Sequence, residues 1–159
     1  MEAANYGQDY KEHLLEQYKL YVQMADNVSA RRSQTNQFYI SVVSALLAVV
    51  ALVGKLFGGE INSRPGLINI SFIAITVLGL GLCLIWFANL LSYRQLNTGK
   101  FTVIHEMEEQ LPYPCYDREW DVLGRGTSPR KYLPLTHIEQ YVPAIVAVPF
   151  LIVLLYTII

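Results

Sequence analysis

Residues 67–91 read LINISFIAITVLGLGLCLIWFANLL, an apolar run without any Asp, Glu, His, Lys or Arg. Such a run matches the roughly 20 residues with which a helix crosses about 30 Å of hydrocarbon. Two further apolar runs, 38–57 and 142–159, flank it, and Lys55 is the one charged residue in either of them. The sequence therefore predicts an all-α membrane protein with three transmembrane helices in each protomer.

The three apolar runs divide the 159 residues into segments. The 37 residues before the first run and the 50 between the second and third runs are too polar to lie in hydrocarbon, so we assign both segments to the aqueous side. The predicted segments are a cytoplasmic amphipathic helix at 1–37, transmembrane helices at 38–57 and 67–91, a cytoplasmic helix with a small irregular module at 92–136, and a third transmembrane helix at 137–159.

Basic residues predict the orientation. Ten of the twelve Lys and Arg residues lie before the first run or between the second and third, and the other side has only Lys55, near the end of the first run, and Arg64. Cytoplasmic loops of membrane proteins carry such an excess of Lys and Arg. We therefore expect the N-terminus in the cytoplasm and the C-terminus outside.

The segment before the first run has the spacing of a helix that packs on other helices. Its apolar positions are separated by steps of four, three, four and three, and neither proline nor glycine interrupts 8–53, so one helix is predicted to continue into the bilayer. Packing on neighbouring helices is favoured over lying flat on the membrane, because the polar face carries both signs of charge. The apolar positions are Leu14, Tyr18, Tyr21, Ala25 and Val28.

The first apolar run carries a stripe of small residues, and two interpretations remain open. Small side chains permit tight packing of helices in lipid. Alternatively, hydroxyl and amide groups line a water-filled path, because they hydrate ions without a buried charge. The predicted pore-lining residues are Thr35, Asn36, Ser41 and Ser44.

The connection between the second and third runs is predicted to begin as a helix. The stretch 100–111 is amphipathic, follows a weak point at Asn97-Thr98-Gly99 and ends before Pro112. A short helix at 117–123 follows. Thr136 and Glu139 match a capping box for the helix of the third span.

The irregular module combines basic and aromatic residues, which together can grip phosphates and stack on bases. Acidic residues of the same stretch, among them Asp117 and Asp121, offer the alternative of a salt-bridged structural module. The candidate residues for a nucleotide or DNA ligand are Arg118, Trp120, Arg125, Arg130, Lys131 and Tyr132.

The pattern does not favour an enzyme. His105 and Glu109 lack the second histidine of a zinc-protease helix, and there is no glycine-rich phosphate loop or nucleophile elbow. We predict no catalytic residue, no metal site and no cofactor. Without Asp, Glu, His, Lys or Arg deep in the spans, a charge-coupled transporter also lacks its usual machinery.

Several stretches resemble the RipA-type octameric membrane proteins of bacteria. They are LLEQYKLYVQMADNVSARR at 14–32, YRQLNTGKF at 93–101, VIHEMEEQLP at 103–112, EW at 119–120, LGRG at 123–126 and YLPLTHIE at 132–139. The resemblance implies a ring-like homo-oligomer in the inner membrane, with eight subunits suggested by the family name.

The layout is also similar to the SLATT-type and Hailong-type membrane effectors of anti-phage systems, although the third span departs from their two-span pattern. In those systems a partner nucleotidyltransferase makes a nucleotide signal, and in Hailong-type systems a short DNA strand holds the channel shut. The resemblance implies an ion channel gated from the cytoplasm. In such a channel we expect the helix at 100–111 to transmit ligand binding, with Gly99 as a hinge. The alternative is a non-conducting membrane scaffold that organises partner proteins.

Overall fold

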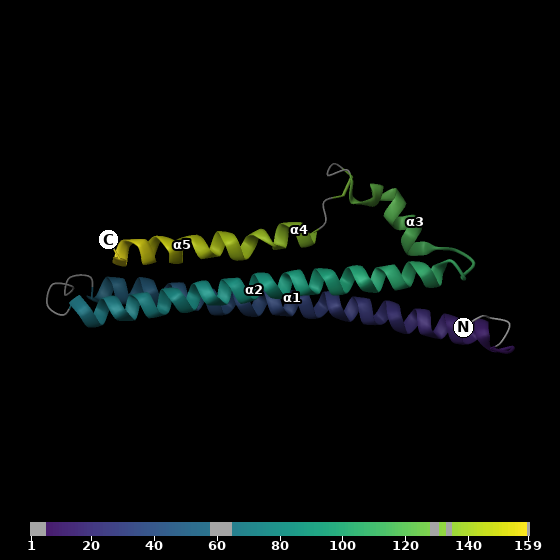
Figure 1. Ribbon diagram of the computed structural model, residues 1–159, viewed down its shortest axis with the longest axis horizontal. Helices are drawn as coiled ribbons and strands as arrows, with labels where there is room; N and C mark the ends of the chain where they lie inside the picture. Colours follow the sequence, from purple (N-terminus) through teal and green to yellow (C-terminus); the bar gives the residue numbers. More distant parts are fainter. Residues whose placement is uncertain (1–5, 58–64, 128–130, 133–134, 159) are drawn as a thin grey trace. The chain divides into compact units, whose positions relative to one another are not determined.

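The computed structural model describes residues 6–57, 65–127, 131–132 and 135–158, and their regular structure is helical. The elements are α1 (Tyr10–Phe57), α2 (Pro65–Glu108), α3 (Cys115–Val122), the one-turn 3₁₀ helix η2 (Gly124–Gly126), α4 (Leu135–Glu139) and α5 (Tyr141–Ile158) (Figure 1). Each of α1, α2 and α5 is long and apolar enough to cross a membrane. The predicted all-α architecture with three candidate spans is therefore confirmed.

The two long helices pass through two compact units. One unit, named here the polar unit, comprises Met1–Arg32 and Ser92–Leu135, and the other, the apolar unit, comprises Ser33–Leu91 and Thr136–Ile159. At 48 and 44 residues, α1 and α2 are each more than twice as long as the roughly 20 residues needed to cross hydrocarbon. The continuous helix expected through 8–53 is thus present as α1.

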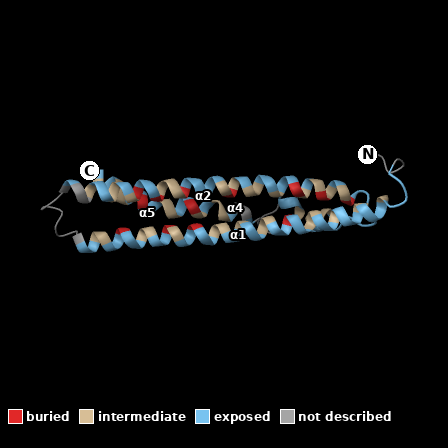
Figure 2. Cartoon of the chain, turned by 90° about the horizontal axis from the view of Figure 1, so that it is seen from below, coloured by how far each residue is buried: buried red, intermediate tan, exposed pale blue. Residues whose placement is uncertain are grey.

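In the apolar unit, α1, α2 and α5 share one hydrophobic core. Val43 and Val50 of α1, Cys83 of α2 and Phe150 of α5 are buried together, and neighbouring leucines, isoleucines and valines pack around them. The buried positions of α1, red in Figure 2, fall along one side of the helix. The opposite side of the same segment is exposed in the isolated chain.

A glycine lets α5 approach α2 closely. The ring of Phe150 is fully buried, and a Cβ atom added to Gly79 would lie 2.4 to 2.7 Å from three of its carbon atoms. Real Cβ contacts are not this short, so only glycine fits beneath the ring. Gly81, two residues further along α2, has nothing within 4 Å of such an atom.

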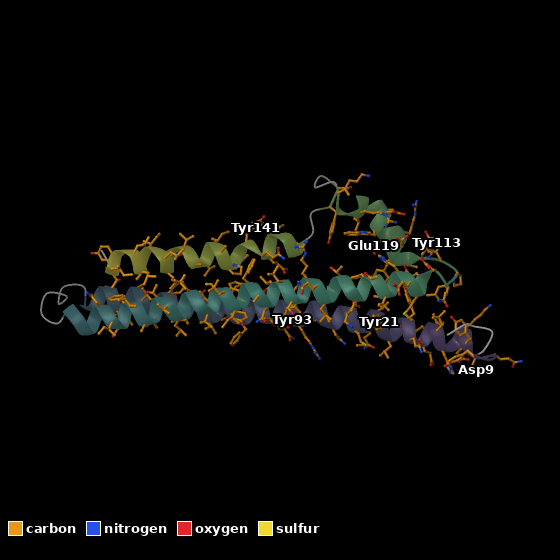
Figure 3. The ribbon with its side chains drawn as sticks, viewed as in Figure 1. Asp9, Tyr21, Tyr93, Tyr113, Glu119 and Tyr141 are labelled. Atoms are coloured by element: carbon orange, nitrogen blue, oxygen red, sulfur yellow. The ribbon has the colours of Figure 1, made fainter. Side chains whose placement is uncertain are left out.

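In the polar unit, α1 and α2 pack along the predicted seam. Ala25 and Ile104 are buried, and the ammonium of Lys100 lies 4.7 Å from the centre of the Tyr21 ring. Tyr21 is labelled in Figure 3. The predicted packing of the N-terminal segment against another helix is confirmed, and the partner is α2 of the same chain.

The end of α2 differs from the prediction in two respects. Asn97, Thr98 and Gly99 are helical rather than a weak point, and α2 ends at Glu108 rather than at residue 111. The hydroxyls of Thr98 and Thr102 each donate to the carbonyl four residues earlier, a bond that a helix accommodates. The earlier end has a steric reason, because the ring of Pro112 would clash with the carbonyl of residue 108 in a continuing helix.

The helix predicted for the third span also begins elsewhere. Thr136 lies inside α4, a turn at Gln140 follows, and α5 starts at Tyr141. The capping-box prediction is therefore wrong for this span. Pro143 occupies the first turn of α5, where a missing N–H costs no hydrogen bond, whereas Pro149 lies inside the helix.

Candidate functional site

The module that follows α2 is organised around Arg125. Its Nε donates to Asp121 Oδ1 at 2.6 Å, and its Nη2 donates to Asp117 Oδ1 at 3.1 Å. Both carboxylates belong to α3, one helical turn apart, so a single guanidinium joins η2 to the whole length of that helix. The Asp121 bond and the charge of Asp117 raise the pKa of Arg125 above its ordinary value.

Arg125 also has an unusual backbone. Its φ is 50°, and it lies between Gly124 at 75° and Gly126 at 68°. A residue other than glycine in this left-handed region is disfavoured by roughly 1–2 kcal/mol. The flanking glycines avoid that cost, and the two aspartate bonds hold Arg125 where its backbone alone would not stay.

Aromatic rings complete the module. Gly126 lies beneath Trp120, whose ring would be 3.4 Å from an added Cβ atom. Trp120 also meets Tyr132 edge to face, with ring centres 6.3 Å apart. Tyr116 of α3 meets Phe101 of α2 at 5.6 Å. The first two contacts hold the module together, and the third fixes it to α2.

Glu108 makes the strongest connection between the module and the long helices. Its side chain is 1 % exposed, and its carboxylate accepts three hydrogen bonds. Oε1 accepts from the Tyr18 hydroxyl and the Tyr116 backbone N–H, both at 2.9 Å, and Oε2 accepts from the Asp117 N–H at 3.1 Å. The last residue of α2 thus caps the first turn of α3 and binds α1 as well.

The capping carboxylate explains where α3 begins. Pro114, which precedes the helix, makes no side-chain cap, so the first N–H groups of α3 need another acceptor. Glu108 supplies it, and the helix starts at Cys115, two residues before the predicted start. A carboxylate is also favoured at this end by the helix dipole.

Two tyrosines near Glu108 respond to this environment. Burial, followed by the hydrogen bond to Glu108, raises the pKa of Tyr18 well above its ordinary value. Burial, followed by the negative charge of Asp26, raises the pKa of Tyr116. Both hydroxyls therefore stay neutral throughout the physiological range.

The predicted ligand-binding residues occupy different positions in the polar unit. Trp120 and Tyr132 contact each other, and Arg125 is bonded to two aspartates. The guanidinium of Arg118 is largely exposed, 4.0 Å from Asp121, and Lys131 is exposed. Arg130 lies outside the described residues. The exposed acidic residue Glu119, labelled in Figure 3, shares α3 with Arg118.

The predicted pore-lining residues lie on α1 in the apolar unit. Ser41 and Ser44 are exposed, and the Ser41 hydroxyl donates to the Gln37 carbonyl. Thr35 and Asn36 are half-buried. Asn36 Oδ1 accepts from the Trp86 indole at 2.9 Å, so this amide already has a role inside the chain.

Asn36 belongs to a set of polar contacts between α1 and α2. Asn89 Nδ2 donates to the Tyr39 hydroxyl at 2.8 Å, and the Tyr39 and Trp86 rings stack with centres 5.7 Å apart. Asn89 is therefore satisfied by a neighbouring helix. Such bonds between helices satisfy polar groups that lipid cannot.

Comparison with known protein families identifies the protein class. The model of the octameric membrane protein family (8xMP) matches residues 15–159. The chain belongs to the octameric membrane protein family. No curated protein and no solved structure shows a significant match.

Membership in the octameric membrane protein family establishes a membrane location and indicates self-association, in agreement with the three apolar helices. The predicted homo-oligomer is supported at this level. Among the described residues of this 8xMP chain, no group of three or more His, Cys, Asp and Glu side chains could hold a metal ion.

Glu108 is the residue that sequence reasoning missed. It stands in the acidic run Glu106-Met107-Glu108-Glu109 and looks like part of a solvated face. The available signal was its place on the helix. Glu108 follows the apolar Ile104 by four residues and therefore lies on the same side of α2, the side that packs against α1.

Proposed function

We propose that eight copies of this chain form an ion-conducting pore in a bacterial inner membrane, with the N-terminus in the cytoplasm and the C-terminus outside. The observation that carries the proposal is the exposed face of α1 in the apolar unit. Hydroxyl and small side chains gather there, and no part of the described chain covers them. Its residues are Ser41, Ser44, Ala45, Ala48 and Ala51.

In a ring of subunits, this face of α1 would line the central path. Repetition around an axis brings one helix from each protomer to the centre, where small side chains leave space and hydroxyls hydrate passing ions. Since 67–91 and 142–159 contain no Asp, Glu, His, Lys or Arg, the charged groups of a coupled transporter are missing from those spans. Passive conduction fits this composition better than active transport.

The proposed pore is gated by an anion on the cytoplasmic side. Arg118 and Lys131 have exposed side chains, and eight copies of each would focus positive potential on a central ligand. Trp120 and Tyr132 are half-buried beside them and offer ring edges for base contacts. Arg125 serves this proposal less well, because Asp117 and Asp121 already neutralise it.

The proposed ligand is a nucleotide or a short single-stranded DNA made by a partner nucleotidyltransferase, and the proposed role is that of an anti-phage defence effector. Support comes from the layout that the chain shares with such effectors and from the exposed cations of the polar unit. Binding would act through the end of α2, where Glu108 joins the module to both long helices.

Recording from the purified octamer in planar bilayers tests conduction. We expect discrete currents that short single-stranded DNA on the polar-unit side suppresses. Ser44→Leu should reduce the unitary conductance severalfold, because it narrows the proposed lumen, while the matched control Ser44→Ala should keep it. Silence of an intact octamer with and without DNA would reject the pore.

A second variant pair tests the ligand site. Arg118→Ala with Lys131→Ala should remove the response to DNA and leave the currents themselves intact. Arg118→Lys with Lys131→Arg preserves charge and serves as the control. A response that persists in the alanine variant would exclude these two cations as the site.

The alternative is a membrane scaffold without a conducting path, and one observation favours it. Asn36, the most polar of the predicted pore residues, already accepts a hydrogen bond from the Trp86 indole through its Oδ1. In a scaffold, Asn36→Leu would weaken packing between α1 and α2, and neither the variant nor the original protein would carry current. The bilayer recordings therefore separate the two functions.

A further inference from the structure

The residues that the structure describes leave one apolar side of the α1 and α2 pair in the polar unit exposed. Leu20 and Met24 of α1 are 59 % and 42 % exposed, and Leu96 of α2 is 50 % exposed. Val103 and Met107 of α2 are half-exposed. These five residues are named here the open face.

The phase of the two helices places these residues on one side. The contacts of Tyr18 with Glu108 and of Tyr21 with Lys100 run in opposite order along the chain, so the helices are antiparallel. At about 100° per residue, Leu20 and Leu96 are each displaced from their seams by roughly 80–120° in the same rotational sense. In an antiparallel pair, residues that are displaced from the two seams by equal angles in the same rotational sense lie on the same side of the pair.

The module occupies the other side. Phe101, which contacts Tyr116 of α3, is turned roughly 140–160° around α2 from Leu96 and Val103. The described part of the module therefore does not cover the open face. Lipid tails are not its cover either, because all five residues lie outside the apolar runs 38–57 and 67–91.

Gly99 adds an independent observation. It lies inside α2 between Leu96 and Val103, and a Cβ atom there would meet nothing within 4 Å. Glycine is a poor residue for a helix interior, and here nothing in the described chain requires it. Small residues on a helix surface allow a second backbone to come close.

We propose that the open face is a subunit interface of the octamer and that a second copy of this chain covers it. The family supplies the occupant, since its members self-associate. An exposed apolar patch outside the membrane is the kind of surface that such an association buries. The contact is heterologous, because a ring of eight closes head to tail, so the open face meets a different surface of the neighbour. The proposal does not depend on conduction.

The test measures the mass of the full-length protein in detergent and in nanodiscs. Leu20→Glu combined with Met24→Glu should lower the octamer fraction by about tenfold or more, because charges would be buried at the interface. Leu20→Met combined with Met24→Leu is the matched control, because both side chains stay apolar and of similar size, and it should leave the octamer intact. Helix content by circular dichroism should be unchanged in both.

A photo-crosslinking residue at position 24 identifies the occupant directly in native membranes. We expect adducts at multiples of the 18.0 kDa chain mass. Adducts with lipid or with another protein, an octamer that survives the double glutamate substitution, or equal loss in the apolar control would each overturn the proposal.

Discussion

At the residue scale, Glu108 has the greatest influence on the polar unit. A buried carboxylate is costly unless hydrogen bonds satisfy it, and here three donors from two other helices do so. The same acceptor fixes the start of α3 and the position of Tyr18. One side chain thus determines how the module is attached.

Glu108→Ala should loosen α3. With the acceptor gone, the Tyr116 and Asp117 amides lose about 1–3 kcal/mol of protection. Hydrogen exchange at these two amides should accelerate about 10- to 100-fold. Glu109→Ala, at the exposed neighbouring position, is the control and should leave both amides protected; equal acceleration in the control would show that the cap is not responsible.

The pH dependence follows from Tyr18. Its pKa is raised in the folded protein, so the neutral form is favoured there, and its contribution to stability is complete below the ordinary tyrosine pKa of about 10. Stability should fall as the pH rises above that value, because the unfolded chain then ionises at Tyr18 while the folded protein still holds the proton. Tyrosinate absorbance should show late-titrating tyrosines, and Tyr18→Phe should remove one of them; an unchanged titration in that variant would contradict the assignment.

At the element scale, the long helices follow from the sequence because their signals are local. Apolar runs and the spacing of Leu14, Tyr18 and Tyr21 predict α1 and its packing side. The start of α3 is not predictable in this way, because its cap comes from α2. The path of Gly124-Arg125-Gly126 depends likewise on bonds to Asp117 and Asp121, so the sequence left both ligand binding and ion pairing open for Arg125.

Gly79→Ala should weaken the attachment of α5. The added methyl group would clash with the ring of Phe150, which is fully buried, at a cost of about 1–3 kcal/mol. The thermal midpoint in detergent should fall, whereas Gly81→Ala should change stability by less than about 0.5 kcal/mol. Phe150→Leu should restore Gly79→Ala; if it does not, the ring is not the cause.

At the scale of the whole molecule, family membership indicates self-association, which the structure of a single chain does not show. In our proposals, self-association places exposed surfaces of both units between or among subunits. These surfaces are the small-residue face of α1 and the open face. Neither surface could be assigned to a partner from composition, because exposed apolar residues also face lipid. The distribution of Lys and Arg remains the basis for the predicted orientation.

The two native cysteines allow the orientation to be measured by thiol labelling, without any introduced cysteine. Cys115 is exposed in the polar unit, and Cys83 is buried in the apolar unit. With the polar unit in the cytoplasm, a membrane-impermeant maleimide should label Cys115 only after the cells are opened. Cys115→Ser is the control and should abolish labelling; modification of Cys115 in intact spheroplasts would reverse the predicted topology.

Glu108 also has a consequence for biosynthesis. The ribosome makes α1 and Glu108 before it makes Tyr116 and Asp117, so the carboxylate emerges with only one of its three partners available. Until α3 has been translated, hydration must replace the two missing amides, and the end of α2 stays open. The docking of α3 therefore has to follow the translation of Tyr116 and Asp117, and a nascent chain that stops before Cys115 keeps a water-accessible α2 terminus.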